Sequence, residues 1–583
     1  AGELTSDFDK LTYTPSRLDK KLLPDILDGK FKLLIITGNA GDGKTAFIKR
    51  IEYDNAIKNL EHFENKNGAK FSIQGIPYES NYDGSQDEDE RANNDVLEAF
   101  FRPFENLKNY NEASEGRIIA INEGRLVEFL KTTEKHKILH NHIEDYFYNE
   151  GHHELPDGLM IINLNLRSVA TQLPDEPSLF RQQVKALTQK GLWNKCEGCS
   201  LANQCFIKYN VDSFNDTAAG EEVITRMEWL LKTASLKREL HITMRDLRSF
   251  IAFTLTRDFD CSEVEDLFNK SNGSPESYWQ YYYFNLTNPN IDDSGNQDRL
   301  IKLLRETDIG EVAIPDLDRD LFFGKHLDKD FLEFAERELS LLEAFNGVER
   351  IKPTYEQDEK VMQRIKIIQK SFVRHHFFEG KAELISMKNG FSRGGQEDNA
   401  MIPSYLKRLP YHSVFKFVKV LREGDTNDLT KASVSRAISL NEGCDNQGID
   451  QNYLVLSSSE IKDPFSKSFR LFDLKDFELF VNRTDHLVKY LEYEPDSLTF
   501  RHRDEKHIKL TISLDLYEML YFIQQGFSPS LNDLRGKFVE LIIFKNLLEN
   551  LNYEEVVVTK DNNEFYKISK DQKSRLLIQT MEL

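Results

Sequence analysis

The sequence predicts an α/β fold whose first third is a parallel β-sheet covered by helices. Apolar runs typical of strands occur at residues 32–37, 71–78, 117–122 and 158–166. The segments between them space their apolar residues as helices do, at residues 45–63, 91–109 and 124–148. Strands that alternate with helices in this way favour a parallel sheet with helices packed against it.

The turn after the first strand carries the motif GNAGDGKT, which matches the phosphate-binding pattern G-x-x-x-x-G-K-[ST]. Its glycines allow backbone N–H groups to close around phosphate oxygens, and the following helix directs its positive end at the anion. Lys44 is placed to reach the β- and γ-phosphates of ATP, and the hydroxyl of Thr45 to hold Mg²⁺. The order strand, loop, helix predicts a P-loop NTPase core with the ATP-binding residues Gly38, Asn39, Ala40, Gly41, Asp42, Gly43, Lys44 and Thr45.

Asn122 and Glu123 end the third predicted strand, at a position where P-loop ATPases usually carry Asp-Glu. The Asp of such a pair holds Mg²⁺, and a neighbouring carboxylate polarises the attacking water. Asn122 can bond a metal-bound water but adds no charge, whereas Glu123 retains the general base. Alternatively, the pair is only a helix N-terminus that Asn122 caps. Two acidic residues after the second strand, Asp83 and Asp87, either restore the missing charge or belong to a solvated loop.

Further polar residues follow the fourth strand and open a later helix. Asn165 is a candidate sensor of the γ-phosphate, and Arg167 is either an arginine finger for a neighbouring chain's nucleotide or a surface ion-pair residue. A capping box, Thr243-x-x-Asp246, predicts the start of the later helix. Arg245 and Arg248 in its first turn either contact phosphate as part of a lid or form a solvated basic face.

The segment CEGCSLANQC has a C-x2-C-x5-C pattern, formed by Cys196, Cys199 and Cys205. Two thiolates spaced as C-x2-C can bind one tetrahedral metal ion. Cys261 is the best candidate for a fourth ligand, because no Cys or His lies between residues 206 and 240, and His241 is second. Zinc is the favoured metal, and an iron–sulfur cluster is the alternative. If no metal is bound, the three cysteines are buried free thiols. A zinc site with four protein ligands would be structural and would fix the helical region to the core.

The chain's charge and composition limit its partners. Lys and Arg number 76 against 97 Asp and Glu, so the net charge of −21 argues against a general nucleic-acid coat protein. No apolar run approaches the ~18–20 residues that span a bilayer, so we expect no membrane part. Five cysteines, three of them clustered, fit a reducing compartment and predict a cytoplasmic protein.

The 583 residues divide into five predicted segments. We expect an N-terminal segment over 1–24, the P-loop NTPase core over 25–175, a helical lid with the cysteine cluster over 176–270, a mostly helical domain over 271–390, and an α+β domain over 391–583. In the last segment, EEVVVTKDNNEFYKI predicts a β-hairpin that turns at Asp561-Asn562-Asn563.

These motifs together resemble one bacterial family. The strings TGNAGDGKTAFIKRIE, YDGSQ, IAINEGRLVEFL, INLNLRSV, CEGCSLANQC, LHITMRDLRSF and LTISLDLYEMLYFIQQGFSPS are similar to the AAA-type P-loop ATPase module of bacterial phage-defence proteins. That module is often fused behind a Ser/Thr protein kinase domain. The resemblance covers about residues 20–270 strongly and 400–583 more weakly.

The resemblance implies an AAA/ASCE-type sheet and a role in anti-phage defence. It also implies that the Asn122-Glu123 pair is normal for the family and that Cys261 completes the cysteine set. The kinase signatures V-A-I-K, H-R-D and D-F-G do not precede the P-loop in this chain. If a kinase belongs to this protein, it either lies upstream of the sequence given or is a separate protein, so a kinase or another defence protein is a possible partner.

Three functions compete at this stage. The leading hypothesis is an ATPase that hydrolyses slowly and converts nucleotide state into a conformational or assembly signal, as a homo-oligomer or with a defence-protein partner. The second is a sensor that binds ATP without hydrolysing it, as Asn122 would allow. The third is a nucleic-acid-binding adaptor, whose basic strip over 364–381 comprises Arg364, Lys366, Lys370, Arg374, His375, His376 and Lys381.

Overall fold

The computed structural model forms two compact units, each described here by itself. The first comprises Ala1–His412 together with Thr484–Glu494, and the second comprises Ser413–Arg483 and Pro495–Leu583. The residues that the structure describes are 7–86, 92–148, 154–203, 205–217, 219–238, 240–270, 279–306, 308, 310, 370–371, 374, 378, 411–424, 429–441, 452–457, 467–482, 485–524, 539–552, 555–559, 565–570 and 575–581.

The first unit contains a six-stranded, mostly parallel sheet in the order β2-β3-β4-β5-β1-β6. Strands β4, β5, β1 and β6 run parallel, and β2 and β3 join their edge antiparallel. The bounds are β1 Leu33–Thr37, β2 Lys58–His62, β3 Ala69–Ile73, β4 Ile76–Asn81, β5 Gly116–Ala120 and β6 Leu159–Asn163. This arrangement confirms the predicted α/β fold and is compatible with a P-loop NTPase core.

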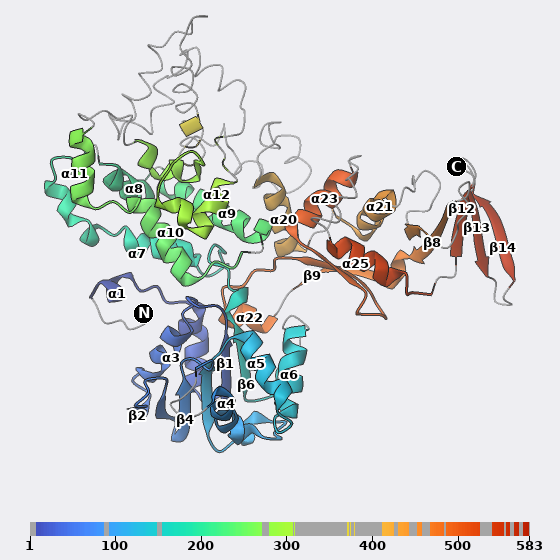
Figure 1. Ribbon diagram of the computed structural model, residues 1–583, viewed down its shortest axis with the longest axis horizontal. Helices are drawn as coiled ribbons and strands as arrows, with labels where there is room; N and C mark the ends of the chain where they lie inside the picture. The colour runs from blue at the N-terminus through green and yellow to red at the C-terminus, as the bar shows by residue number, and fades with distance from the viewer. Residues whose placement is uncertain are drawn as a thin grey trace, which may run out of the picture. The chain divides into compact units, whose positions relative to one another are not determined.

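Helices cover both faces of the parallel part (Figure 1). Alternate residues of a strand point to opposite faces. Leu34 and Ile36 of β1 therefore pack with α3 (Lys44–Glu52) on one face, whereas Leu33 and Ile35 pack with three helices on the other. Those three helices are α4 (Asn93–Phe101), α5 (Glu123–Thr132) and α6 (Lys137–Tyr148). Because both faces are covered, β1, β5 and β6 are buried along their whole length.

Two sequence-based predictions between residues 45 and 81 are wrong in detail. The helix expected over 45–63 ends at Glu52, and its second half forms the exposed strand β2. The single strand expected over 71–78 is the hairpin of β3 and β4, which turns at Gln74-Gly75. Both turn residues have positive φ angles, 50° and 82°, which is the geometry of tight hairpin turns.

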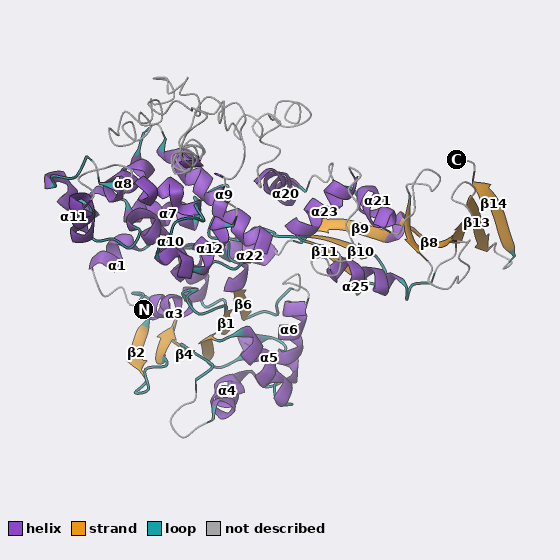
Figure 2. Ribbon diagram, turned by 45° about the horizontal axis from the view of Figure 1, so that its top comes forward, coloured by secondary structure: helices purple, strands orange, loops and turns teal. Residues whose placement is uncertain are grey.

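A helical region follows the sheet in the chain (Figure 2). It consists of α7 (Leu179–Leu187), α8 (Phe206–Asn215), α9 (Gly220–Arg238), α10 (Met244–Thr256), α11 (Cys261–Lys270) and α12 (Arg299–Arg305). The polar stretch expected to be a long loop over 269–298 is described from residue 279 onward. There it forms short 3-10 turns whose Tyr282, Tyr283 and Phe284 are buried.

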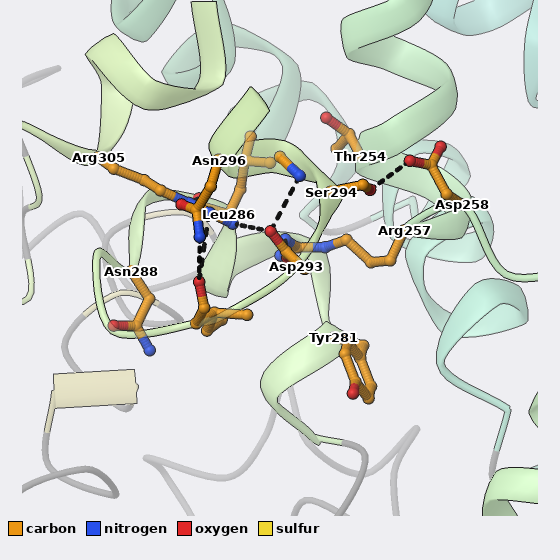
Figure 3. Close-up of polar contacts among 12 residues, drawn as sticks. Thr254, Arg257, Asp258, Tyr281, Leu286, Asn288, Asp293, Ser294, Asn296 and Arg305 are labelled. Atoms are coloured by element: carbon orange, nitrogen blue, oxygen red, sulfur yellow. Dashed lines mark hydrogen bonds and ion pairs between the residues drawn. The ribbon is translucent and has the colours of Figure 1, made fainter. Parts of the chain in front are cut away.

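A buried charge cluster ties this stretch to its neighbouring helices (Figure 3). Asp293 accepts a hydrogen bond from Nη2 of Arg305 at 2.7 Å, and its second oxygen lies 3.5 Å from Nη1 of Arg257. Arg257 ends α10 with a φ of 53° and is almost fully buried, which lowers its pKa to about 9. A single carboxylate thus compensates two buried guanidinium groups.

Replacing Asp293 with Asn should destabilise the first unit by about 3 kcal/mol or more, because breaking a buried ion pair leaves uncompensated charge. The amide oxygen of the Asn can still accept the hydrogen bond from the backbone N–H of Gly295, so the variant removes the charge and keeps the turn. Urea unfolding measures the loss. Asp292→Asn, an exposed neighbour, is the matched control, and equal midpoints for the two variants would contradict the prediction.

A short segment from late in the chain belongs to the first unit. Helix α22 (Asp485–Tyr490) carries Lys489 and Tyr490, both of which bond the carboxylate of Asp25 at 2.6 Å. Glu492 then accepts a hydrogen bond from the backbone of Arg17 at 2.7 Å. The N-terminal elements η1 (Leu18–Leu22) and α2 (Leu23–Leu27) are therefore clamped by residues more than 400 positions away in sequence.

The second unit combines helices with antiparallel sheets. One sheet is ordered β11-β10-β9 and the other β14-β13-β12-β8-β7. The hairpin predicted in EEVVVTKDNNEFYKI is confirmed as β12 paired with β13. The bounds are α20 Tyr411–Glu423, α21 Lys431–Asn441, β7 Tyr453–Ser457, β8 Lys467–Asp473, β9 Phe477–Val481, β10 Leu498–His502, β11 Lys509–Ile512, α23 Leu514–Gln524, α25 Val539–Leu548, β12 Glu555–Thr559, β13 Phe565–Lys570 and β14 Leu576–Met581.

Across the described parts of both units, none of the helices combines the length and the apolar character needed to cross a membrane.

Candidate nucleotide-binding site

The predicted phosphate loop lies between β1 and α3, in the order strand, loop, helix. Gly43 precedes the helix with a φ of 89°, a left-handed conformation that glycine adopts without steric cost. Gly41 has a φ of 102°, and a Cβ on it would lie 3.0 Å from Cβ of Arg245. Both glycines thus adopt left-handed backbone conformations that favour glycine, and at Gly41 a side chain would also crowd α10.

Asp42, inside the loop, is buried and holds the loop in shape. Its carboxylate accepts a hydrogen bond from the backbone N–H of Asn39 at 2.6 Å and contacts Nε2 of His241 at 2.6 Å. Its backbone carbonyl accepts from Nη2 of Arg167, also at 2.6 Å. The loop is therefore fastened from two sides, by the segment before α10 and by the segment after β6.

Lys44 points back into the loop. Its ammonium group donates to the carbonyls of Gly38 at 2.7 Å and Asn39 at 2.8 Å. Burial lowers the pKa of Lys44, while the carboxylates of Asp42 and Asp83 act in the opposite direction. The hydroxyl of Thr45 donates to the backbone carbonyl of Tyr82 at 3.3 Å. A cation, a hydroxyl and a helix N-terminus thus meet where a nucleotide's phosphates would bind.

A pocket of about 700 Å³ opens over this loop. That volume is in the range of small-molecule sites, which is ~300–1,000 Å³. The core and α10 both contribute to its wall, so a bound ligand would contact two parts of the first unit. The lining residues are Gly38, Asn39, Ala40, Gly41, Gly43, Lys44, Thr45, Ala46, Tyr82, Asp83, Ser85, Ile121, Asn122, Met244, Arg245, Arg248 and Ser249.

Asn122 and Glu123 lie differently with respect to this pocket. Asn122 lines it and also caps α5, because its side chain accepts from the N–H of Gly124 at 3.0 Å. Glu123 is half-buried, and its carboxylate accepts a hydrogen bond from the amide of Asn163 at 3.4 Å. Burial raises the pKa of Glu123, and the bond from Asn163 partly offsets that effect.

The structure brings Asn163, rather than the candidate Asn165, to Glu123. Asn163 is the last residue of β6, and its side-chain oxygen also accepts from the backbone N–H of Asn165 at 3.0 Å. The side-chain oxygen of Asn165 is buried and has no hydrogen-bond partner. The sequence could have indicated Asn163, because it is a polar residue at the last position of a buried strand.

The candidate arginines split between two places. Arg245 and Arg248 line the pocket, and the guanidinium of Arg248 also donates to the hydroxyl of Thr12 at 3.2 Å. The backbone N–H of Arg245 donates to the carbonyl of Gly41 at 3.2 Å. Arg167 is buried and bonds the P-loop of its own chain, so its guanidinium does not project from the surface toward a neighbouring chain.

The remaining candidates lie apart from the pocket. Cys196 and Cys199 flank the end of a short turn, Cys205 precedes α8, and Cys261 begins α11. Burial raises the pKa of the Cys196 thiol, and the thiols of Cys261 and Cys199 raise it further. Among the described residues, which include these four, no group of three or more His, Cys, Asp and Glu side chains is arranged to hold a metal ion.

The structure places two further candidates away from their predicted sites, and a third lies outside the described residues. His241, the second candidate for a zinc ligand, contacts Asp42 of the P-loop instead. Asp87 lies outside the described residues. Most of the basic strip over 364–381 does too, and its Arg374 is buried in a two-bond ion pair with Asp308, at 2.8 and 2.6 Å.

Comparisons of this chain with models of known protein families, with curated proteins and with solved structures found no match.

Proposed function

We propose that the chain binds ATP·Mg²⁺ in this pocket and hydrolyses it slowly. The observation that carries the proposal is the P-loop itself, with Lys44 and Thr45 at the start of α3 and a pocket of about 700 Å³ above them. Mg²⁺ would neutralise the phosphate charge, as it does in other P-loop enzymes. Thr45 supplies an oxygen ligand for it, and Glu123 is the proposed carboxylate that activates water.

We further propose that nucleotide state acts as a switch through α10. Arg245 and Arg248 face the same pocket as the P-loop, and the segment before α10 already contacts that loop through His241 and Asp42. Phosphates bound between these groups would favour one arrangement of α10 over another, which is what a ligand-driven switch requires. An AAA/ASCE-type assembly, a homo-oligomer or a kinase partner, and a role in anti-phage defence are proposed on the resemblance alone.

The test is a measurement of ATP affinity by calorimetry with Mg²⁺, followed by phosphate release with and without DNA or RNA. Micromolar binding with slow release supports an ATPase. Tight binding with no release supports the alternative, a non-hydrolysing sensor. A specific observation favours that alternative: Glu123 bonds Asn163 rather than lining the pocket. No binding at all would overturn both.

We also propose that the four cysteines bind one Zn²⁺ per chain, with an iron–sulfur cluster as the alternative. Zinc binding would require the four thiols to move together, because among the described residues no group of three or more such side chains is arranged to hold a metal ion. Four thiols form a donor set that suits Zn²⁺. Zinc binding requires thiolates, so it would release protons from thiols whose pKa values burial has raised.

Elemental analysis of anaerobically purified protein should find about one zinc per chain. Cys261→Ser should lower the zinc content as much as Cys199→Ser does, because each removes one of four ligands. Ser262→Ala, next to Cys261 in α11, controls for disturbance of the helix. Iron with sulfide would indicate a cluster, and metal-free protein would mean that the thiols are structural.

A further inference from the structure

Among the residues that line the pocket, one carries a carboxylate, Asp83, and it follows strand β4. In the sheet β4 lies beside β5, which lies beside β1, and all three strands are parallel. The carboxyl ends of parallel strands meet at one edge of a sheet, where ligands bind. Asp83, two residues beyond the end of β4, is therefore brought to the edge where the P-loop follows β1.

Asp83 lines the pocket beside the residues that we propose to bind phosphate and metal. Asp83 and its neighbour Tyr82 line the pocket together with Lys44 and Thr45. The carbonyl of Tyr82 accepts the Thr45 hydroxyl at 3.3 Å, so the proposed metal-binding hydroxyl lies one residue from Asp83.

The loop holds Asp83 firmly. Its backbone N–H donates to the side chains of Asn67 at 2.9 Å and Asn81 at 3.0 Å, and its carbonyl accepts from Asn67 at 3.2 Å. Its carboxylate accepts one bond from the N–H of Ser85 at 3.0 Å and one from Gln86 at 3.3 Å. An ionised carboxylate can accept about four hydrogen bonds, so lone pairs remain for a metal ion or its water.

We propose that Asp83 is the carboxylate that holds Mg²⁺ together with Thr45 when nucleotide is bound. This inference rests on the proposed ATP binding. Mg²⁺ in phosphate-transfer sites is held by one or two carboxylates in addition to the phosphates. Asn122, in the same pocket, offers a neutral amide, and Glu123 bonds Asn163 instead of lining the pocket. Asp83 therefore supplies the negative charge that the Asn122 position lacks.

The test compares ATP binding in Mg²⁺ and in EDTA. Wild type should bind more tightly with Mg²⁺. Asp83→Asn should bind in EDTA as wild type does, but should lose roughly 10- to 100-fold of the tightening by Mg²⁺, the typical loss for one charge-assisted contact. The amide can still accept from Ser85, so the loop should be retained, and an unchanged melting temperature checks this.

A second readout uses Mn²⁺ in place of Mg²⁺. The electron paramagnetic resonance signal of protein-bound Mn²⁺·ADP should weaken in Asp83→Asn but not in Glu64→Gln, an exposed carboxylate of the β2–β3 turn. Full Mg²⁺ dependence and full Mn²⁺ binding in Asp83→Asn would overturn the inference, as would their loss in Glu123→Gln alone. A wild type that fails to bind ATP in either buffer would instead overturn the proposed function.

Discussion

Lys44→Ala should abolish measurable ATP binding. Lys44 is half-buried, lines the pocket, and donates from its ammonium group to two carbonyls of its own loop. Hydrogen bonds to charged groups contribute about 1.5–3 kcal/mol each. Loss of two such contacts to phosphate would weaken binding at least about 100-fold, at 1.4 kcal/mol per factor of ten.

Calorimetric titration with ATP and Mg²⁺ measures this effect. Lys131→Ala, an exposed lysine in the last turn of α5, is the control and should bind as wild type does. Removing Lys44 also leaves the carbonyls of Gly38 and Asn39 without that donor, so the melting temperature must be recorded alongside. A stable Lys44→Ala protein with wild-type affinity would show that the loop is not a phosphate site.

Local sequence was enough to predict the strand, the glycine-rich turn and the helix of the first motif, because they lie within about 20 consecutive residues. The same holds for the capping box of α10, where Thr243 and Asp246 exchange hydrogen bonds as expected. Short-range patterns failed where two elements share one apolar run. The stretch 71–78 looks like one strand, and only the Gln74-Gly75 pair at its centre indicated a hairpin.

The contacts that shape the site could not be predicted, because they join residues far apart in the chain. His241 is 199 positions from Asp42, and Asn163 is 40 positions from Glu123. A buried acid inside the P-loop needs a partner, but nothing in its own segment indicates which one. For Asp83, the sequence left a solvated loop and a metal-binding carboxylate as alternatives, and the order of the strands is what favours the second.

The residues of α10 show the same limit of local sequence patterns. From sequence, Arg245 and Arg248 were either lid residues or a solvated basic face. Both line the pocket, and the backbone of Arg245 bonds Gly41. A Cβ on Gly41 would lie 3.0 Å from Cβ of Arg245, so this glycine of the motif also allows the close approach of α10. A single motif residue can thus meet two structural requirements, a special backbone conformation and a close contact with another helix, and the sequence indicates only the first.

Glu123→Gln should leave ATP binding intact and lower phosphate release at least about 100-fold. The amide keeps the shape of the side chain and can still accept from Asn163, but it cannot take a proton from water. Wild-type turnover should itself be slow. Losing one charge-assisted contact at Asn122 costs about 1.5–3 kcal/mol, a factor of roughly 10–150 in rate, and an arginine from a partner could restore ~10³–10⁵.

Single-turnover phosphate release, with ATP affinity measured in parallel, separates chemistry from binding. Glu128→Gln is the matched control, since this carboxylate lies on the same helix and is 70% exposed. Unchanged release in Glu123→Gln would move the catalytic carboxylate elsewhere, with Asp83 next in line because it already lines the pocket. If wild type releases no phosphate even with partners added, then the hydrogen bond between Asn163 and Glu123 describes a site that binds ATP without cleaving it, and the sensor is the correct function.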